Sequence, residues 1–359
     1  MKGYLVLSTG EIFEGVWNGS AQEAYGEVVF YTGMSGYQEV LTDPANKGHI
    51  VVFTYPMIGN CGMNDVNNES GSIQVEAIIT NSCSKEAFHY EATSTVQSRC
   101  VEENVPLLSG FDTRAIVKRI REQGDMAAIV TTDLKSVDFS KQQKLEEREL
   151  VQEVSAREIK SFGEGKHHVV IIDFGTKKSL IDTLKVLDCK VTVVPYETSF
   201  EEITSLQPDG IVLSNGPGTP KLLASELKKI KQLAITFPTL AVSLGHQLLA
   251  LAFGGDVEKL SFGHRGGNQP IIDLSTNKVY MTSQNHSYSV KEESLAGTGF
   301  SVRYKNINDR SVEGMVHDVY PILSVQFHPE AHPGAEDSGE IFTLFIQQMR
   351  SKRREKVYA

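Results

Sequence analysis

The second half of the chain alternates continuous apolar runs with amphipathic segments, and this pattern restricts the fold more than any other feature. The apolar runs predict strands at His168–Asp173, Cys189–Tyr196, Asp209–Gly218 and Phe237–Ser243. A run that is apolar at every position is typical of a parallel-sheet strand buried on both faces. A helical segment at Lys178–Leu187 and helix-like stretches before the later strands supply the crossovers. We therefore predict an α/β fold with an open, mostly parallel sheet and flanking helices, whose functional groups lie at the carboxyl ends of the strands.

The first half is built differently. Short segments rich in β-branched or aromatic residues predict strands at Tyr4–Leu7, Glu27–Tyr31 and His49–Thr54. The stretch Asp112–Glu122 has helical spacing, with Asp112 or Thr113 as its N-cap. A charge-rich stretch follows. We predict a mixed α/β N-terminal domain at 1–132, a linker with a surface helix at 133–166, and a second domain at 167–359, two domains being usual for 359 residues.

The composition excludes several classes of protein. The hydrophobic fraction of 40% and the charged fraction of 22% are ordinary for a globular chain. A formal net charge of -10 argues against non-specific nucleic-acid binding, which needs basic surface. The four cysteines form no C-x-x-C pair, so neither a zinc site nor a disulfide framework is predicted. The apolar burst near the N-terminus is too short for a signal peptide, and no apolar run reaches about 18 residues. We expect a cytoplasmic protein with no membrane contact.

The strongest chemical motif is the segment Ala241–Gly245, at the predicted junction between a strand and the helix LGHQLLALAF. It has the order small, x, nucleophile, x, glycine, which is typical of a tight elbow that exposes a nucleophile, here Ser243. The N-terminus of the following helix offers amide groups to a developing oxyanion. The structural alternative is an ordinary strand–helix junction with an incidental serine.

Other polar loops also follow predicted strands. In Gln326–Glu330, a histidine and a glutamate two positions apart form a candidate base and its orienting carboxylate. In Ser214–Gly218, glycines permit a backbone amide to approach a ligand closely. The structural alternatives are a surface carboxylate and a Gly-Pro turn. The histidines of these and neighbouring loops lack an accompanying carboxylate or cysteine pattern, so no metal is predicted.

Taken together, these motifs resemble the class I (triad) glutamine amidotransferases in order and spacing. The similar segments are LSNGPGTP, VSLGHQLLALAFGG, FGHRGGNQP, TSQNHSYSV and VQFHPEAHPG. Within that family, FGHRGGNQP and the whole first half resemble the small subunit of glutamine-dependent carbamoyl phosphate synthetase. The first-half segments are GEVVFYTGMSGYQEVLTDP, TYPMIGNCGMND and GFDTRAIVKRIRE. The resemblance covers essentially the full chain.

The resemblance implies glutamine hydrolysis that supplies ammonia to a large partner subunit. That subunit is expected to bind ATP, bicarbonate and Mg and to make carbamoyl phosphate for arginine or pyrimidine biosynthesis. No cofactor or metal is expected in this chain. The family's catalytic cysteine, histidine and glutamate correspond to Ser243, His328 and Glu330. The implied glutamine-binding residues are Ala45, Gly216, Gly218, Leu244, Gln247, Asn285, Ser287 and Tyr288, with the amides of Gly216 and Leu244 as oxyanion donors.

The sequence departs from the family pattern at its centre. Ser243 stands where the family has cysteine, and a serine hydroxyl has essentially no alkoxide at neutral pH. We therefore expect glutamine hydrolysis to be slower by several orders of magnitude unless His328 compensates. The other departures are Ala241 for glycine, Ala45 for serine, Ser287 for glycine and Thr219 for aspartate. A laboratory Cys→Ser change would alter a single residue, whereas several pocket positions differ together here. We therefore hypothesise natural drift in a chain that no longer depends on glutamine hydrolysis.

Two further interpretations come from different classes of function. The first is a glutaminase-impaired structural subunit of an ammonia-dependent synthetase, which the integrity of the Ser243 pocket would distinguish. The second is a serine hydrolase built on the same elbow. Its usual order is serine, acid, histidine, whereas the order here is Ser243, His328, Glu330. The order therefore disfavours the hydrolase.

Overall fold

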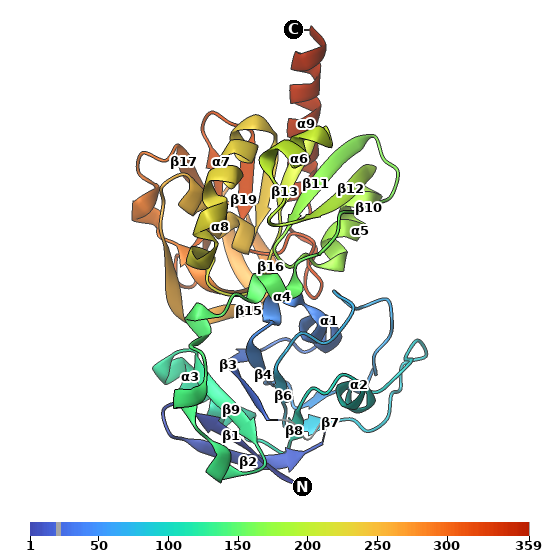
Figure 1. Cartoon of the computed structure of the whole chain (residues 1–359), viewed down its shortest axis with the longest axis vertical. Coiled ribbons are helices and arrows are strands. Elements are labelled where there is room, and N and C mark those ends of the chain that lie inside the picture. The colour runs from blue at the N-terminus through green and yellow to red at the C-terminus, as the bar shows by residue number, and fades with distance from the viewer. Residues whose placement is uncertain (19–22, 359) are drawn as a thin grey trace. The chain divides into compact units, whose positions relative to one another are not determined.

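The computed structural model of the chain describes residues 1–18 and 23–358, which divide into two compact units (Figure 1). Unit 1 comprises Met1–Leu150 and Leu260–Gly266, and unit 2 comprises Val151–Lys259 and Gly267–Ala359. The inclusion of the short segment Leu260–Gly266 in unit 1 was not predicted. We retain the division into 1–132, 133–166 and 167–359 as a proposal for domain boundaries.

Unit 1 is built around a closed β-barrel. In barrel order its strands are β1 (Lys2–Leu7), β2 (Ile12–Trp17), β8 (Leu107–Ser109), β6 (Ala77–Ile79), β4 (His49–Phe53), β3 (Ala24–Tyr31) and β9 (Met126–Thr131). β5 (Met57–Ile58) pairs with β7 (Ser82–Cys83) outside the barrel. The three strands predicted in the first half correspond to β1, β3 and β4. Around the strands lie α1 (Tyr37–Thr42), the 3-10 turn η1 (Pro44–Asn46), α2 (Val96–Glu102) and α3 (Thr113–Gln123).

The helix α3 confirms the helical periodicity of the first half. The Asp112 carboxylate accepts a hydrogen bond from the amide of Ala115 at 2.9 Å, so Asp112 is the N-cap and Thr113 is the first helical residue. Ile116 and Ile120 are fully buried in the core formed with the barrel strands. The helix therefore forms because a capped start precedes an apolar stripe that the barrel covers.

The segment expected to form a surface helix between the domains forms shorter elements instead. They are the 3-10 turns η2 (Leu134–Ser136), η3 (Phe139–Lys141) and η4 (Leu145–Glu147), followed by α4 (Leu150–Val154) and β10 (Lys160–Phe162). The side chains of Asp133 and Asp138 accept hydrogen bonds from amides two residues later. Such local bonds compete with a continuous helix, and the segment has few buried apolar residues to oppose them.

Unit 2 contains a sheet with a parallel half and an antiparallel half, which confirms the predicted α/β class. The parallel half has the order β12 (Cys189–Pro195), β11 (His167–Asp173), β13 (Gly210–Leu213), β14 (Thr239–Val242), β19 (Ile322–Val325). The sheet continues with β18 (Val312–His317), β16 (Val279–Val290), β15 (Val257–Asp273) and β17 (Phe300–Asn306), and β10 pairs with the edge of β12.

Helices cover both faces of the parallel half (Figure 1). On one face, Val170 and Ile172 of β11 share a core with α6 (Phe200–Ser205), α7 (Leu227–Thr236) and α8 (Leu244–Ala252). On the other face, Val169 and Ile171 share a core with α5 (Lys178–Val186) and α9 (Glu340–Tyr358). Because successive strand residues point to opposite faces, both faces need apolar side chains. The 3-10 turns η5 (Pro220–Glu226) and η6 (Glu292–Leu295) complete the unit.

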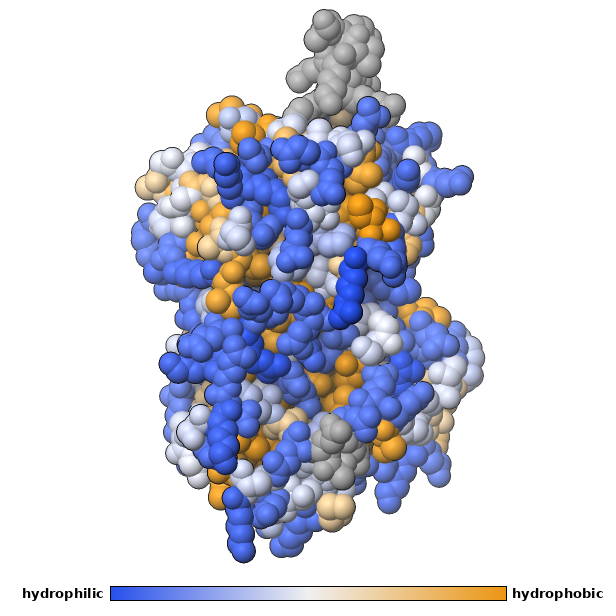
Figure 2. Space-filling model, in the orientation of Figure 1, coloured by the Kyte–Doolittle hydropathy of each residue, from blue (hydrophilic) through white to orange (hydrophobic). Residues whose placement is uncertain are grey.

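The surface and the thiols carry little further information. On the face drawn in Figure 2, hydrophilic residues predominate and hydrophobic residues occur in small, separate groups. None of the helices in the described ranges is long and apolar enough to cross a membrane. Cys61, Cys83, Cys100 and Cys189 all carry free thiols.

Candidate active site

Ser243 occupies the predicted elbow between β14 and α8. Its backbone has φ 52° and ψ -107°, and a positive φ of this kind is strained for a residue with a side chain. The Ser243 amide donates to the carbonyl of Val325 at 2.9 Å, which ties the elbow to the adjacent strand β19. Strain held in place by a neighbouring strand is characteristic of a nucleophile elbow, so the backbone has the predicted conformation, and the catalytic role of Ser243 stays a prediction.

The small residues on either side of Ser243 fit the elbow for different reasons. A Cβ atom on Gly245 would lie 2.3 Å from the carbonyl oxygen of Leu213, so only glycine fits there. The Gly245 amide donates to the carbonyl of Ser214 at 3.0 Å. Ala241 lies within β14, and its methyl group is fully buried in the core of unit 2. The replacement of the family's glycine by Ala241 is therefore accommodated by the core.

His328 and Glu330 form a buried pair at the end of β19. The His328 Nδ1 donates to Glu330 Oε1 at 2.9 Å, and His328 is only 2% exposed. The other ring nitrogen, Nε2, is buried and has no hydrogen-bond partner among the described residues. With Nδ1 as the donor, the neutral ring keeps its acceptor lone pair on Nε2. This is the arrangement that a general base held by a carboxylate requires.

Lys177 completes this pair, and the sequence analysis did not identify it. Its ammonium group lies 3.3 Å from Glu330 Oε1 and donates to the carbonyls of Ala331 and His332 at 2.9 and 2.6 Å. Burial raises the pKa of Glu330, but the neighbouring Lys177 and His328 outweigh burial and lower that pKa to about 2. The carboxylate is therefore ionised at neutral pH. The only local signal was the position of Lys177, just after the buried strand β11.

The strand order brings the predicted catalytic residues to one edge of the sheet. β14 and β19 are parallel neighbours, with Val242 opposite Val325. Ser243 follows the first strand directly, and His328 follows the second after two residues. The amide of His328 donates to the carbonyl of Ser283 at 2.8 Å, which also ties this edge to β16. All three predicted catalytic residues thus lie at the carboxyl ends of the strands.

The loop after β13 carries Gly216 and Gly218. A Cβ atom on Gly216 would lie 2.2 Å from the carbonyl oxygen of Phe174 and 3.0 Å from the Leu244 side chain. Gly218 has φ +87°, which favours glycine. Leu244 is the first residue of α8, so its amide has no intrahelical acceptor. Gly216 thus packs tightly against Phe174 and the Leu244 side chain, and the role of the two amides as oxyanion donors stays a prediction.

The remaining predicted binding residues of unit 2 lie on or beside β16. The Gln247 side-chain amide donates to the carbonyl of Tyr288 and to Gln326 Oε1, both at 3.0 Å. Gln247 therefore connects α8 with β16 and with the strand end that precedes His328. Asn285 and Ser287 lie on β16 and are partly buried. Ala45 belongs to unit 1, where it is 4% exposed within η1, and its role in binding stays a prediction.

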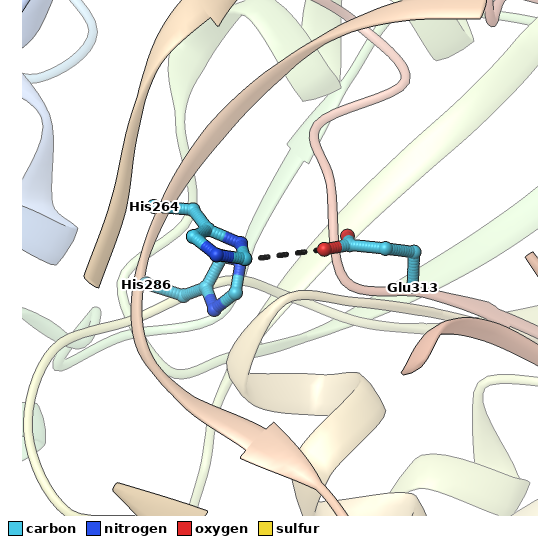
Figure 3. A group of neighbouring side chains, drawn as sticks. All are labelled: His264, His286 and Glu313. Carbon is cyan, nitrogen blue, oxygen red and sulfur yellow. Dashed lines mark ion pairs between the residues drawn. The ribbon is translucent and has the colours of Figure 1, made fainter. Parts of the chain in front are cut away.

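A buried polar network stabilises β16 at this point. His286 Nδ1 donates to the carbonyl of Tyr288 at 2.8 Å, and its Nε2 lies 4.0 Å from Glu313 Oε1 (Figure 3). The Gln284 amide donates to Glu313 Oε2 at 3.0 Å. Figure 3 also draws His264, which belongs to unit 1. Within unit 2, the network holds the strand that carries Asn285 and Ser287.

The elbow, the His–Glu pair and the parallel sheet together define a class of enzyme domain. Residues 170–348 match the family model described as "Glutamine amidotransferase class-I". Residues 5–130 match the model described as "Carbamoyl-phosphate synthase small chain, CPSase domain". The chain therefore belongs to the carbamoyl-phosphate synthase small chain family, as the sequence motifs predicted.

Several relatives match over the whole length of the chain. An arginine-specific carbamoyl phosphate synthase small chain of Halalkalibacterium halodurans is 56% identical over 359 residues, covering 100% of both chains. Proteins of the same name from Bacillus subtilis and Geobacillus stearothermophilus are 48% and 51% identical, again covering 100% of both chains. The two halves of the chain therefore occur together in the same order in these relatives.

Proposed function

We propose that this small chain hydrolyses glutamine at Ser243 and supplies the ammonia to the large subunit of an arginine-linked carbamoyl phosphate synthase. The observation that carries the proposal is the local geometry around Ser243. The residue lies in a strained elbow beside the strand end that bears a buried His328–Glu330 pair. The link to arginine is supported by the names of the relatives that match the full chain.

The proposed chemistry proceeds in two steps. The Ser243 hydroxyl oxygen attacks the side-chain carbonyl carbon of glutamine, and its proton passes to Nε2 of His328. The amides of Gly216 and Leu244 stabilise the oxyanion, and ammonia departs with the proton from His328. Water, activated by the same nitrogen, then hydrolyses the γ-glutamyl ester and releases glutamate. Glu330 holds the ring and stabilises the imidazolium that forms in each step.

The serine limits the rate of this chemistry. A cysteine is partly thiolate at neutral pH, whereas a serine hydroxyl depends wholly on its base. We therefore expect Ser243→Cys to raise the rate of glutamate release by several orders of magnitude. Ser243→Ala should abolish the release that remains.

The second candidate function is that of a glutaminase-impaired structural subunit of an ammonia-dependent synthetase. The departures from the family pattern at Ala45, Thr219 and Ser287 favour it, since they coincide with positions near the implied glutamine pocket. In that case the chain would fold and bind the large subunit while free ammonia supplied the nitrogen.

One experiment separates the two candidates. The complex reconstituted with its large subunit is given either glutamine or ammonium, and glutamate release and carbamoyl phosphate synthesis are both measured. Synthesis from glutamine that is lost in Ser243→Ala supports a working nucleophile. Synthesis from ammonium alone, with no recovery of glutamine use in Ser243→Cys, would mean that the pocket has decayed and that the chain is structural.

The remaining expectations concern the complex. We propose that ATP, bicarbonate and Mg bind to the large subunit and that this chain holds no cofactor of its own. The free thiols of all four cysteines suit a reducing compartment, which supports a cytoplasmic location.

A further inference from the structure

A hydrogen bond between two hydroxyl groups joins two segments of the candidate site that are far apart in the sheet. The Thr219 Oγ1 and the Tyr288 hydroxyl oxygen lie 3.1 Å apart. Thr219 ends the glycine-containing loop after β13, and Tyr288 lies on β16. In the sheet order, β14, β19 and β18 separate these two strands. The bond therefore connects segments on either side of the strand ends that carry Ser243 and His328.

Both hydroxyl groups are oriented for this contact rather than for local ones. Thr219 stands at the N-cap of η5, yet its side chain makes no capping bond there. A threonine in that position would ordinarily bond to the backbone of its own helix. Tyr288 is anchored through its main chain, since its carbonyl accepts from Gln247 Nε2 and from His286 Nδ1. Its backbone position is therefore fixed independently of Thr219.

We propose that the Thr219–Tyr288 bond is a positioning contact that holds the glycine-containing loop after β13 against β16 and so raises the affinity of the site for glutamine. The inference rests on the proposed function and deepens it, because it names the pair that orders the pocket. A loop already held in its binding conformation loses less entropy when the ligand arrives. Thr219, which first stood out as a departure from the family pattern, thus takes part in an ordered contact.

The test compares variants that differ by single hydroxyl groups. Thr219→Val and Tyr288→Phe each remove one partner at nearly constant shape, and Thr219→Ser keeps the hydroxyl. Tyr280→Phe is a matched control, since Tyr280 also lies on β16 and its hydroxyl donates to Glu340 at 2.8 Å. The reconstituted complex carries Ser243→Ala throughout, so that L-glutamine binds without turnover and its Kd can be measured by calorimetry.

The expected result is weaker binding, and so a larger Kd, in two variants and an unchanged Kd in the controls. Thr219→Val and Tyr288→Phe should each weaken L-glutamine binding by about 3- to 10-fold, the range of one neutral hydrogen bond. The double variant should be no worse than either single one, because both remove the same bond. Thr219→Ser and Tyr280→Phe should stay within about twofold of the parent. A role in folding alone would change the melting temperature and leave the Kd unaltered.

Different failures have different meanings. Unchanged Kd values in both Thr219→Val and Tyr288→Phe, or losses that simply add in the double variant, would overturn this inference and leave glutamine hydrolysis standing. If the parent complex does not bind L-glutamine at all, the proposed function fails and this inference fails with it.

Discussion

At the scale of single residues, Glu330 is the buried charge on which the candidate site depends. Its side chain is fully enclosed, and it remains ionised because Lys177 and His328 lie beside it. The carboxylate has a lower pKa in the folded chain than in the unfolded one. It therefore contributes stability above its ordinary pKa, and this contribution is lost as the pH falls from about 4.5 to about 2.

Lys177→Met should destabilise unit 2 by about 3–5 kcal/mol at neutral pH, because it removes the ammonium group that pairs with the buried Glu330 carboxylate. It should also flatten the loss of stability below pH 4.5, since the pKa of Glu330 rises toward its ordinary value. Urea denaturation at several pH values measures both effects. The neighbouring Lys178 is exposed, and Lys178→Met should change stability by no more than about 0.5 kcal/mol. Equal losses in the two variants would contradict the assignment.

His246 gives a second pH dependence with a different range. Burial lowers the pKa of this histidine to about 3, and its Nδ1 lies 2.9 Å from the hydroxyl of Ser324. Between about pH 6.5 and pH 3 the unfolded chain binds a proton that the folded chain does not. Stability therefore falls with falling pH in that range and is unaffected by this group above it.

His246→Gln should remove that dependence. The slope of unfolding free energy against pH between pH 6 and pH 4 should decrease by up to about 1.4 kcal/mol per pH unit, the value for one proton. The exposed His89→Gln serves as the control, and its slope should match that of the parent. The same slope in His246→Gln as in the parent would show that the buried ring does not set this part of the profile.

At the scale of secondary-structure elements, the elbow depends on how closely α8 approaches β13. The carbonyl of Leu213 lies where a Cβ atom of residue 245 would be, so the helix begins against the backbone of a neighbouring strand. Gly245→Ala should therefore cost about 1–3 kcal/mol of stability and displace Ser243 from its working position. Urea denaturation and glutamate release measure the two effects. Gly71→Ala, where a Cβ atom meets open space, should do neither.

The elements that the sequence predicted well are those whose pattern is local. The apolar run at His168–Asp173 indicates a strand buried on both faces, and β11 has that environment. The elbow at Ser243 was predictable because the tight turn itself requires the small residues that flank Ser243 in the sequence. Lys177 was missed because its partner Glu330 lies far along the chain, in the segment after β19, and nothing near Lys177 marks it as buried. The predicted surface helix is replaced by shorter elements because the side chains of Asp133 and Asp138 accept hydrogen bonds from nearby backbone amides.

At the scale of the whole molecule, a segment from the second half of the chain completes unit 1. The Asp125 carboxylate accepts from the amide of Gly263 and from the Arg265 guanidinium, both at 3.1 Å. Both side chains of the ion pair are buried. Sequence patterns could not predict this contact, because it joins residues far apart in the chain and follows from neither periodicity nor spacing.

Asp125→Ala should destabilise unit 1 by about 3–5 kcal/mol, because it removes a buried counter-ion of Arg265. Thermal unfolding and limited proteolysis, with cleavage sites mapped by mass spectrometry, measure the loss and its location. Cleavage should concentrate in unit 1. The exposed Asp65→Ala provides the comparison and should unfold with the parent. Early cleavage confined to unit 2 would contradict the prediction.

The segment Leu260–Gly266 also determines how the chain can be rearranged by recombination. A single crossover between the two halves would separate unit 1 from a strand that it needs, since β15 supplies that strand from the other side of the junction. Replacing the C-terminal half with another amidotransferase would therefore succeed only if the donor brought a matching strand with it. Because unit 1 contains residues from both halves of the chain, protein engineers who exchange the halves must treat them as one module.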